Sequence, residues 1–512
     1  MSKVYISTPI YYVNGAPHIG HAHTTVMADI LKRSRLMMGM DAWLTTGTDE
    51  HGQKNQEAAE KSGQECQDYL DQKSGEFRTV FDRLGVSYDM FVRTTRPEHM
   101  KQVAHIEQTL FDQGLIVKKK YSGQYCTGCE QFKKESDLTP EGRCPDHSNV
   151  ELEQTDEVNY FLQIEPYREW LRDYAEQNPE WLQPSRYRSE LLGMLKEPLE
   201  DLCISRPKTR VSLGVELPFD SDYVTYVWFD ALINYITNVG WPDEKYNDWW
   251  PYSMHLIGKD IVKTHCIYWP IMLHALDVAP PNQVVVHGYW VGPGGQKMSK
   301  TLGNVVDPIE VMDTFGADAL RFYLAKHMRG SVDSQISMEL MLQTYTSDLA
   351  NNIGNLLARV SKFANSRFDG VIPAPENIHP DDQKLAEAVA ANIGKACGRY
   401  EMTDIPDVLN AILAEARALN EYVADKAPWT MIKDEDARDR VASILYVALD
   451  GLRLVFEGLY PFVPETANKG LAVLGRENMN QKVHQHVFQA GDLKPASAFG
   501  DMVNLFPRID LK

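Results

Sequence analysis

The chain has 512 residues, of which 43% are hydrophobic and 24% charged, so we expect a soluble protein of more than one domain. Its formal net charge of −19 disfavours indiscriminate binding to polyanions, although a local basic patch is compatible with it. No apolar run reaches the roughly 18–20 residues of a membrane helix, and the first residues lack a secretory h-region, so we expect a cytoplasmic protein.

The first elements are predicted to form a βαβ unit. Residues 3–8 (KVYIST) are apolar and β-branched, which favours a strand. An amphipathic pattern from His18 to Met38 predicts a helix, and Gly39 stands where a C-cap belongs. Residues 41–52 (DAWLTTGTDEHG) predict a second strand that runs into a polar loop. Strand, helix and strand at this spacing indicate a parallel α/β sheet.

The rest of the chain changes character twice. A loop-rich segment is expected at about 118–205, and strand-like runs return at 223–229, 253–258 and 284–290. Beyond about residue 307 long amphipathic stretches, separated by breakers, predict a C-terminal α-bundle. These stretches are 338–368, 381–402, 406–426 and 435–459.

Three histidines lie within residues 17–23 (PHIGHAH), where the first strand is predicted to give way to the helix. A helix N-terminus offers N–H groups and a positive dipole end, which favour phosphate. Gly20 lets a ligand approach the backbone, and imidazoles donate hydrogen bonds to charge that builds on phosphate oxygens. Such strings also occur as helix caps or by chance in loops, so this motif alone leaves both roles open.

A second phosphate-binding pattern lies at residues 292–304 (GPGGQKMSKTLGN). Its glycines favour a mobile loop, and Lys297 and Lys300 are point charges suited to phosphates. Such a loop can close over a triphosphate and act only in the transition state. A solvated basic loop is the alternative.

A metal site is predicted from two close pairs of ligands, Cys126 with Cys129 and Cys144 with His147. Four protein ligands suit a tetrahedral Zn²⁺ and leave no open position, so one structural zinc per chain is expected. It would stabilise an insertion too small to bury a core of its own. Unrelated thiols are the alternative. Seven cysteines are too few for a disulfide framework at this length.

Two phosphate-binding motifs on one α/β sheet are more specific than either alone. With His18, Ile19, Gly20 and His21 (HIGH) and residues 297–301 (KMSKT), the chain resembles the class I aminoacyl-tRNA synthetases, and within them the methionyl-tRNA synthetase family. Many members end the second motif in serine, whereas Thr301 keeps the hydroxyl. The resemblance covers essentially the whole chain. It implies a Rossmann-like parallel-sheet catalytic domain, split by a small zinc-binding insertion and followed by a C-terminal α-helical bundle.

The domains implied are a first catalytic half (1–117), a connective insertion (118–205), a second catalytic half (206–335) and an anticodon-binding domain (336–512). The implied activity is that of an ATP-dependent methionine–tRNA ligase. Methionine and Mg²⁺-bound ATP would form methionyl-adenylate and pyrophosphate, and the methionyl group would pass to the 3'-terminal adenosine of tRNA(Met), for initiation and elongation. Catalysis is then mainly positioning and charge stabilisation.

The resemblance also assigns residues to the ATP site. His18, His21, Lys297 and Lys300 would be catalytic. The full set of ATP-binding residues would be His18, Gly20, His21, Gly258, Asp260, Lys297 and Lys300. A carboxylate such as Asp260 can accept hydrogen bonds from ribose hydroxyls, and a helix cap is the alternative for it.

For methionine, Asp49 resembles the acid on the ammonium side and Arg206 its ion-pair partner, since a buried carboxylate needs one. The side chain would lie among Ile10, Tyr12, Trp228, Ala231, Leu232, Tyr235, Ile261 and His265. Aromatic rings suit a thioether, although core packing is the usual reason for such residues. The short insertion leaves no room for the hydrolytic domain of leucine- and isoleucine-type relatives, which favours methionine.

For the tRNA, the resemblance assigns Asn355, Arg359 and Trp429 to the CAU anticodon. Stacking and edge hydrogen bonds read single-stranded bases, which suits these side chains. Asn355 and Arg359 lie four residues apart on one helix face, a pairing that surface helices also carry routinely. No dimerisation barrel follows the bundle in this sequence, so we expect a monomer.

Three other functions stay open from sequence alone. A small nucleotidyltransferase shares both phosphate motifs but needs neither the bundle nor the zinc insertion. A non-catalytic RNA-binding paralogue would be expected to lose His18, His21 or Lys300, and all three are present. A synthetase for another amino acid is disfavoured by the pocket residues and the short insertion.

Overall fold

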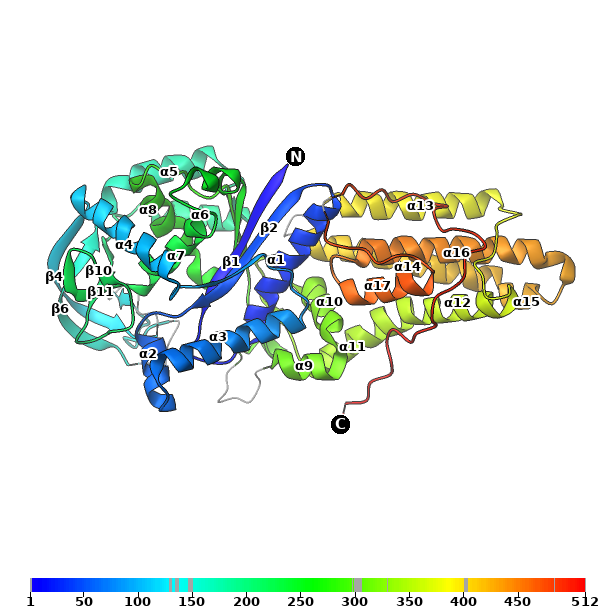
Figure 1. Cartoon of the computed structure of the whole chain (residues 1–512), viewed down its shortest axis with the longest axis horizontal. Helices are drawn as coiled ribbons and strands as arrows, with labels where there is room; N and C mark the ends of the chain where they lie inside the picture. The colour runs from blue at the N-terminus through cyan, green and yellow to red at the C-terminus, as the bar shows by residue number, and fades with distance from the viewer. Residues whose placement is uncertain are drawn as a thin grey trace.

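A six-stranded parallel sheet forms the centre of the N-terminal part of the chain, in the order β3-β2-β1-β12-β13-β7 (Figure 1). The computed structural model describes residues 2–128, 131–133, 138–145, 151–296, 298, 306–328, 330–399, 404–482 and 484–511. The strands of this sheet are β1 (Lys3–Tyr12), β2 (Asp41–Asp49), β3 (Met90–Arg93), β7 (Leu182–Gln183), β12 (Ser253–Gly258) and β13 (Gln283–His287).

The predicted βαβ unit is confirmed. β1 pairs in parallel with β2, and α1 (Ile19–Met37) connects them. Side chains alternate along β1, so that Val4 and Ile6 enter one hydrophobic cluster and Tyr5 enters the other, on opposite faces of the sheet. The order of strands reverses between β1 and β12, which makes that junction the topological switch point where such sheets bind ligands.

Helices cover both faces of the sheet (Figure 1). Residues of α1 and α3 (Cys66–Arg83) belong to the first cluster, and those of α4 (Pro97–Asp112), α7 (Val227–Thr237) and α8 (Trp269–Ala275) to the second. The short α2 (Gln53–Ser62) follows β2. The strand predicted at 223–229 needs correction: β11 (Asp220–Thr225) ends early and α7 begins at Val227. β11 pairs with β9 (Ser205–Pro207) and β10 (Glu216–Leu217).

The segment at 118–205 is more regular than the predicted loops. β4 (Ile116–Cys126), β5 (Gln131–Lys133), β6 (Glu153–Leu162) and β8 (Leu202–Cys203) form an antiparallel sheet in the order β5-β4-β6-β8. α5 (Arg168–Gln177) and α6 (Ser185–Met194) follow β6, and β7 between them joins the edge of the parallel sheet. β4 and β6 could not be predicted because they carry runs of exposed polar and charged residues, such as residues 118–120, which dilute the β-branched signal.

The predicted C-terminal α-bundle is confirmed (Figure 1). Its entry comprises β14 (Trp290–Val291), α9 (Pro308–Phe315), α10 (Ala317–His327) and β15 (Ser334–Gln335). The stretch at 338–368 is α11 (Met338–Thr344), a π-helix (Tyr345–Gly354) and α12 (Asn355–Arg367). The other helices are α13 (Pro380–Cys397), α14 (Ile405–Lys426), α15 (Pro428–Met431), α16 (Arg438–Leu459) and α17 (Pro464–Val473). Among the described helices, none is long and apolar enough to cross a bilayer.

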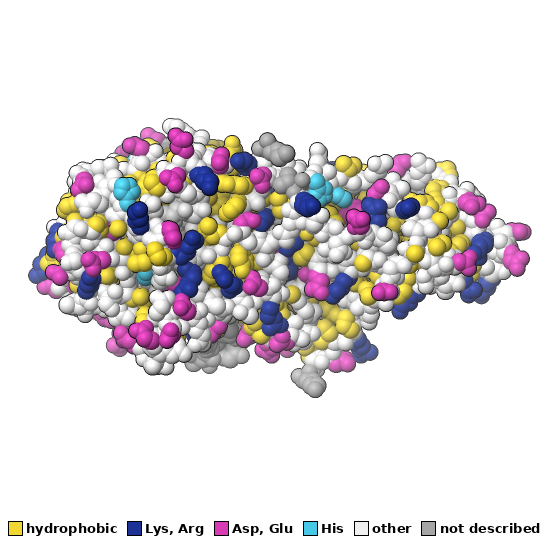
Figure 2. All heavy atoms as spheres, in the orientation of Figure 1, with side chains coloured by type: hydrophobic (Ala, Val, Ile, Leu, Met, Phe, Trp, Pro, Cys, Tyr) yellow, Lys and Arg dark blue, Asp and Glu magenta, His cyan; other side chains and the backbone are white. Residues whose placement is uncertain are grey.

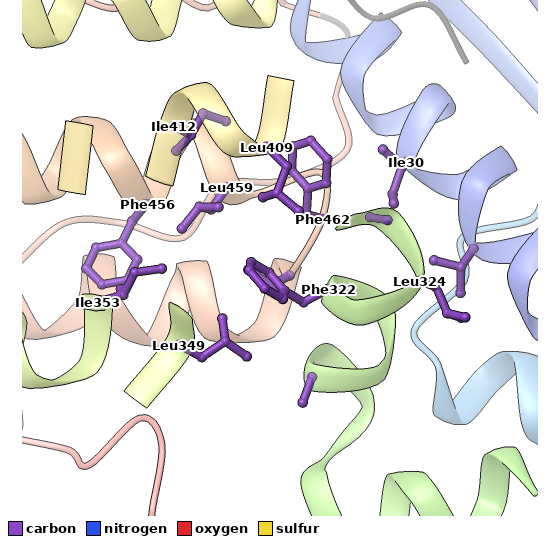
Figure 3. Close-up of a cluster of buried hydrophobic side chains, with 14 of the residues drawn as sticks. Ile30, Phe322, Leu324, Leu349, Ile353, Leu409, Ile412, Phe456, Leu459 and Phe462 are labelled. Carbon is purple, nitrogen blue, oxygen red and sulfur yellow. The ribbon is translucent and has the colours of Figure 1, made fainter. Parts of the chain in front are cut away.

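The core of the bundle continues into the α/β part (Figure 3). Ile30 of α1 and Leu324 of α10 lie in the same cluster as Leu409 of α14 and Phe456 of α16. After α17 the chain returns to the α/β part, where Met38 and Gln485 form an isolated β-bridge. On the face in Figure 2, basic and acidic side chains are interspersed, which suits a negatively charged protein without a general affinity for polyanions.

Candidate active site and anticodon face

The two predicted nucleotide elements lie on either side of the switch point. His18 and His21 follow the carboxyl end of β1, and Gly258 is the last residue of β12. β1 and β12 are neighbours in the sheet, so residues about 240 positions apart meet at one edge. The fold therefore brings these parts of the predicted ATP site together.

The start of α1 fixes the tautomers of both motif histidines. His18 is the N-cap; its Nδ1 accepts from the backbone N–H of Gly20 at 3.1 Å. The backbone N–H of His18 donates to Nδ1 of His21 at 3.2 Å. A neutral imidazole that accepts at Nδ1 carries its hydrogen on Nε2, so each neutral ring is a donor at Nε2. The helix thus presents donors of the kind that phosphate oxygens accept.

The two rings are held in place by packing. Their centroids lie 3.6 Å apart in a stacked arrangement. A Cβ on Gly20 would come within 3.0 Å of the His18 ring, so a larger residue would displace it. Burial against Tyr11 and Phe77, with His18 as a second cause, holds the pKa of His21 well below its usual value. The His21 ring is therefore neutral at pH 7.

Gly258 and Asp260 are in close contact. A Cβ at position 258 would lie 2.6 Å from Oδ1 of Asp260, so this carboxylate packs directly on the glycine backbone. The residues that follow form a short 3₁₀ turn (Lys259–Ile261) and a π-helix (Thr264–Tyr268), a form that is frequent at functional sites. Of the second phosphate motif, Lys297 and Lys300 lie outside the described residues. Gly294 and Gly295, just before them, have φ of 76° and 79°.

The aromatic residues predicted for the methionine site form one continuous group. The ring of Trp228 lies edge-on to Tyr12, with 6.3 Å between centroids, and to His265, at 6.4 Å. The Tyr235 hydroxyl and Nε2 of His265 are 2.9 Å apart. Because Nδ1 of His265 donates to the carbonyl oxygen of Ile261 at 2.9 Å, Nε2 accepts from Tyr235. Burial lowers the pKa of His265 to about 4, which agrees with this neutral tautomer.

The other predicted pocket residues come from the same strands and helices. Ala231 and Leu232 are buried on α7, and Leu232 belongs to the core cluster below it. Ile10 is half-buried in β1, and Ile261 is half-buried in the turn after β12.

The predicted acid and its partner lie in strands of two different sheets. Asp49 is buried at the end of β2. Arg206 is buried in β9, donates to the carbonyl oxygen of Ser205 at 2.7 Å and lies over the ring of Tyr226. The ion pair between Asp49 and Arg206 stays a prediction.

The zinc prediction is only partly within the described residues. Cys126 ends β4, and Cys144 lies between β5 and β6; both side chains are fully buried. Cys129 and His147 lie outside the described residues. Within the described part of the chain, no group of three or more His, Cys, Asp and Glu side chains is arranged to hold a metal. The two buried thiols are of the type that binds Zn²⁺, and they would supply two of the four ligands of a tetrahedral site.

Two of the three residues predicted for the anticodon are in contact in the bundle. Arg359 of α12 lies over the ring of Trp429, with its guanidinium carbon 4.9 Å from the ring centroid. Asn355 is exposed one helical turn before Arg359. Trp429 follows Ala427, whose positive φ of 43° ends α14 and turns the chain into α15. The turn thus presents the Trp429 ring to α12.

Sequence reasoning missed one polar cluster beside the pocket. Asp230 of α7 accepts hydrogen bonds from His51, after β2, and from His99 of α4. These partners are 179 and 131 residues away, and no local pattern links them. The histidine next to the DEHG turn and the acid within WFDAL were the only signals in the sequence.

Comparisons with known proteins agree with this geometry. The family model for class I tRNA synthetases (M) matches residues 4–361, and that for the anticodon-binding domain of methionyl-tRNA ligase matches residues 372–511. The methionine–tRNA ligase of Clostridium acetobutylicum is 39% identical over 99% of this chain and 78% of its own length. That of Rickettsia conorii is 35% identical over 99% of both chains.

Solved structures give the same result. Mycobacterium tuberculosis methionyl-tRNA synthetase in complex with methionyl-adenylate superposes with a TM-score of 0.92. It is 32% identical, and the match covers 99% of this chain and 100% of that one. The two motifs, the switch-point geometry and these full-length matches have one reading: the chain belongs to the methionine–tRNA ligase family of class I aminoacyl-tRNA synthetases.

Proposed function

We propose that this chain activates L-methionine with ATP and transfers the methionyl group to the 3'-terminal adenosine of tRNA(Met). The observation that carries the proposal is the full-length match to a structure holding methionyl-adenylate, on a chain that retains both phosphate motifs. The Nε2–H groups of His18 and His21 would donate to ATP phosphates as charge develops in the transition state. Mg²⁺ would enter with ATP and neutralise its phosphates.

The remaining assignments belong to the same proposal. Lys297 and Lys300 would stabilise the α-phosphate and the leaving pyrophosphate. Asp260 would accept from the ribose hydroxyls beside Gly258. Asp49, with Arg206, would hold the methionine ammonium, and the aromatic group described above would enclose the thioether.

Two further parts would serve the tRNA and the metal. Asn355, Arg359 and Trp429 would read the CAU anticodon, and the placement of Arg359 over the half-buried Trp429 ring supports this role because such planar groups suit unstacked bases. One Zn²⁺ held by Cys126, Cys129, Cys144 and His147 would stabilise the insertion. We also propose the division into residues 1–117, 118–205, 206–335 and 336–512.

The test is amino-acid-dependent exchange between ATP and pyrophosphate, without tRNA, across all twenty amino acids. Exchange with methionine alone would support the proposal, whereas exchange with another amino acid would overturn the specificity. No exchange from folded protein would favour the non-catalytic RNA-binding reading. As a matched variant, Lys300→Ala should cut adenylate formation far more than methionine binding, because its contact belongs to the transition state.

A further inference from the structure

A buried cluster of one acid and two histidines lies beside the proposed methionine site. Asp230 is 1% exposed. Its Oδ2 lies 2.6 Å from Nδ1 of His51, and its Oδ1 lies 2.8 Å from Nε2 of His99. An ionised carboxylate only accepts, so both ring nitrogens donate to it. Burial alone would raise the pKa of Asp230, but His51 and His99 bring it to about 2, so the side chain is charged at pH 7.

The cluster joins three separate elements. His51 lies in the loop after β2, two residues beyond Asp49. The amide of Asn55 holds this loop by donating to the backbone carbonyls of Asp49 and His51, each at 2.9 Å. His99 comes from α4, which packs beside α7, and its Nδ1 lies 3.2 Å from the hydroxyl of Thr237 on α7 (Figure 1). Asp230 therefore links the loop of Asp49, α4 and α7.

Two of these three elements contribute residues to opposite sides of the proposed methionine pocket. β2 brings Asp49, the proposed ammonium ligand, and α7 brings Trp228 and Tyr235, which belong to the aromatic group. Two short charge-assisted hydrogen bonds, shielded from water, hold geometry more tightly than packing alone. Binding sites need their contacting groups within about 0.5 Å of the productive position.

We propose that Asp230 is a positioning residue that sets the separation between the ammonium side and the aromatic side of the methionine pocket. His51 and His99 act through Asp230, because the N–H groups of both rings donate to its carboxylate. The inference rests on the proposed function and adds to it a control of amino-acid specificity. Among the described residues, the side-chain hydrogen bonds of Asp230 go to His51 and His99 and not to His18, His21 or Asp260, so we expect its effect to fall on methionine.

The first test is Asp230→Asn, assayed by methionine-dependent exchange between ATP and pyrophosphate. The two histidines donate to different oxygens of Asp230, and asparagine replaces one of these oxygens by an NH2 group that cannot accept, so one link is lost at nearly unchanged volume. We expect the KM for methionine to rise roughly tenfold or more, and the KM for ATP to stay within about twofold. Discrimination against norleucine and ethionine, which differ from methionine in the thioether region, should fall in parallel.

The second test uses replacements that keep or lose one donor. The amide nitrogen of asparagine takes the place of Nδ1, and that of glutamine the place of Nε2, because of their distances from Cβ. His51→Asn and His99→Gln should therefore retain a methionine KM near the wild-type value. His51→Gln and His99→Asn should raise it as Asp230→Asn does. A generic loss of buried imidazole would not produce this crossed pattern.

A control variant separates positioning from stability. Asp382 is a fully buried acid of the bundle that pairs with Arg440, far from the pocket. Asp382→Asn should lower Tm without changing the KM for methionine. If Asp230→Asn lowers Tm and leaves that KM unchanged, or raises both KM values equally, the positioning role is overturned. If the wild-type protein shows no methionine-dependent exchange, the proposed function itself has failed.

Discussion

Asp29 of α1 and Arg321 of α10 form a completely buried ion pair, with 2.7 Å between Oδ2 and Nη2. Arg321 also donates to the backbone carbonyls of Pro461 and Phe462, at the turn between α16 and α17. Arg33, one turn along α1, is a second partner of Asp29 at 2.7 Å. The helix that begins with the HIGH motif is thus bonded through Asp29 to the C-terminal bundle.

Asp29→Asn should destabilise the protein strongly, because it leaves two buried guanidinium groups without their counter-charge. Burial raises the pKa of Asp29, but Arg33 and Arg321 bring it well below its usual value. This contribution is present above the unfolded pKa of about 4 and is lost as the pH falls. We expect a loss of about 3–5 kcal/mol at neutral pH, measured by urea unfolding.

The pH dependence and a control complete this test. The difference between wild type and Asp29→Asn should narrow as the pH falls to about 4 and below. Asp313 forms an exposed pair with Arg83, and Asp313→Asn should cost less than about 1 kcal/mol. Equal losses in the two variants would contradict the role given to burial.

Glu107 should make the protein less stable as the pH rises. Its carboxyl is fully buried on α4 and accepts from the Thr225 hydroxyl at 2.8 Å. Burial, with Asp230 as a lesser cause, raises the pKa of Glu107 well above its usual value. The folded state keeps a proton that the unfolded state loses above about pH 4, so stability falls from there upward through the folded pKa.

Glu107→Gln removes this titration at nearly constant volume. As the pH rises over the range above the unfolded pKa of about 4, the variant should therefore gain stability relative to wild type. Unfolding free energies measured across that range check it. A difference that does not change with pH would show that Glu107 is ionised in the folded protein.

His21 offers a test of the tautomer argument. Its hydrogen is on Nε2, because Nδ1 accepts from the backbone of His18. His21→Gln keeps a donor at the Nε2 distance, whereas His21→Asn does not. We expect His21→Asn to slow adenylate formation by roughly 10²–10³, and His21→Gln to slow it less. Equal rates for the two variants, at unchanged methionine affinity, would argue against donation from Nε2.

Trp429→Ala should weaken charging of tRNA(Met) and leave the tRNA-free exchange intact. The ring supports the Arg359 guanidinium, and a stacked base is worth about 1–3 kcal/mol, or about 5- to 150-fold in the KM for tRNA. Trp429→Phe keeps an aromatic face, so its charging of tRNA(Met) should be intermediate between that of the wild type and that of Trp429→Ala. A drop in the tRNA-free reaction would instead make Trp429 a folding residue.

Zinc content tests the insertion. Purified protein should hold about one zinc per chain, and Cys126→Ser and Cys144→Ser should lower it. Cys397, a buried thiol of α13 in the bundle, is the control, and Cys397→Ser should leave zinc unchanged. Elemental analysis after dialysis gives the answer. A full complement of zinc in the Cys126 variant would rule out that ligand.

Much of the fold could be predicted from sequence where a pattern is long and one-sided. α1 and the bundle helices carry apolar stripes, β1 is rich in β-branched and aromatic residues, and β12 is a short buried run. The prediction missed β4 and β6 because Lys118, Lys119 and Glu157 give these strands a polar composition. α7 was partly misread because YVTYVWF suits a strand as well as a helix, and only tertiary packing decides.

The residues of the candidate site also differ in how far the sequence alone could predict them. Motif residues could be placed from sequence because backbone geometry fixes them locally, as in the capping of His18 and His21. The links of Asp230 to His51 and His99 could not, because they depend on where α4 and α7 pack against β2. Contacts between residues more than a hundred positions apart leave no periodicity to detect.

Because α1, α10 and the bundle share one core, we expect that this enzyme cannot be truncated to a stable catalytic fragment. A catalytic fragment ending near residue 335 would uncover Ile30, Leu324 and the Asp29–Arg321 pair, and it would lose the β-bridge to Met38. Such a fragment would expose apolar surface and a buried charge together, and should aggregate. Two family models divide the chain, yet one buried core and the Asp29–Arg321 pair join its two parts, so we expect the parts to unfold together and a swap of bundles between relatives to require matching α1 as well.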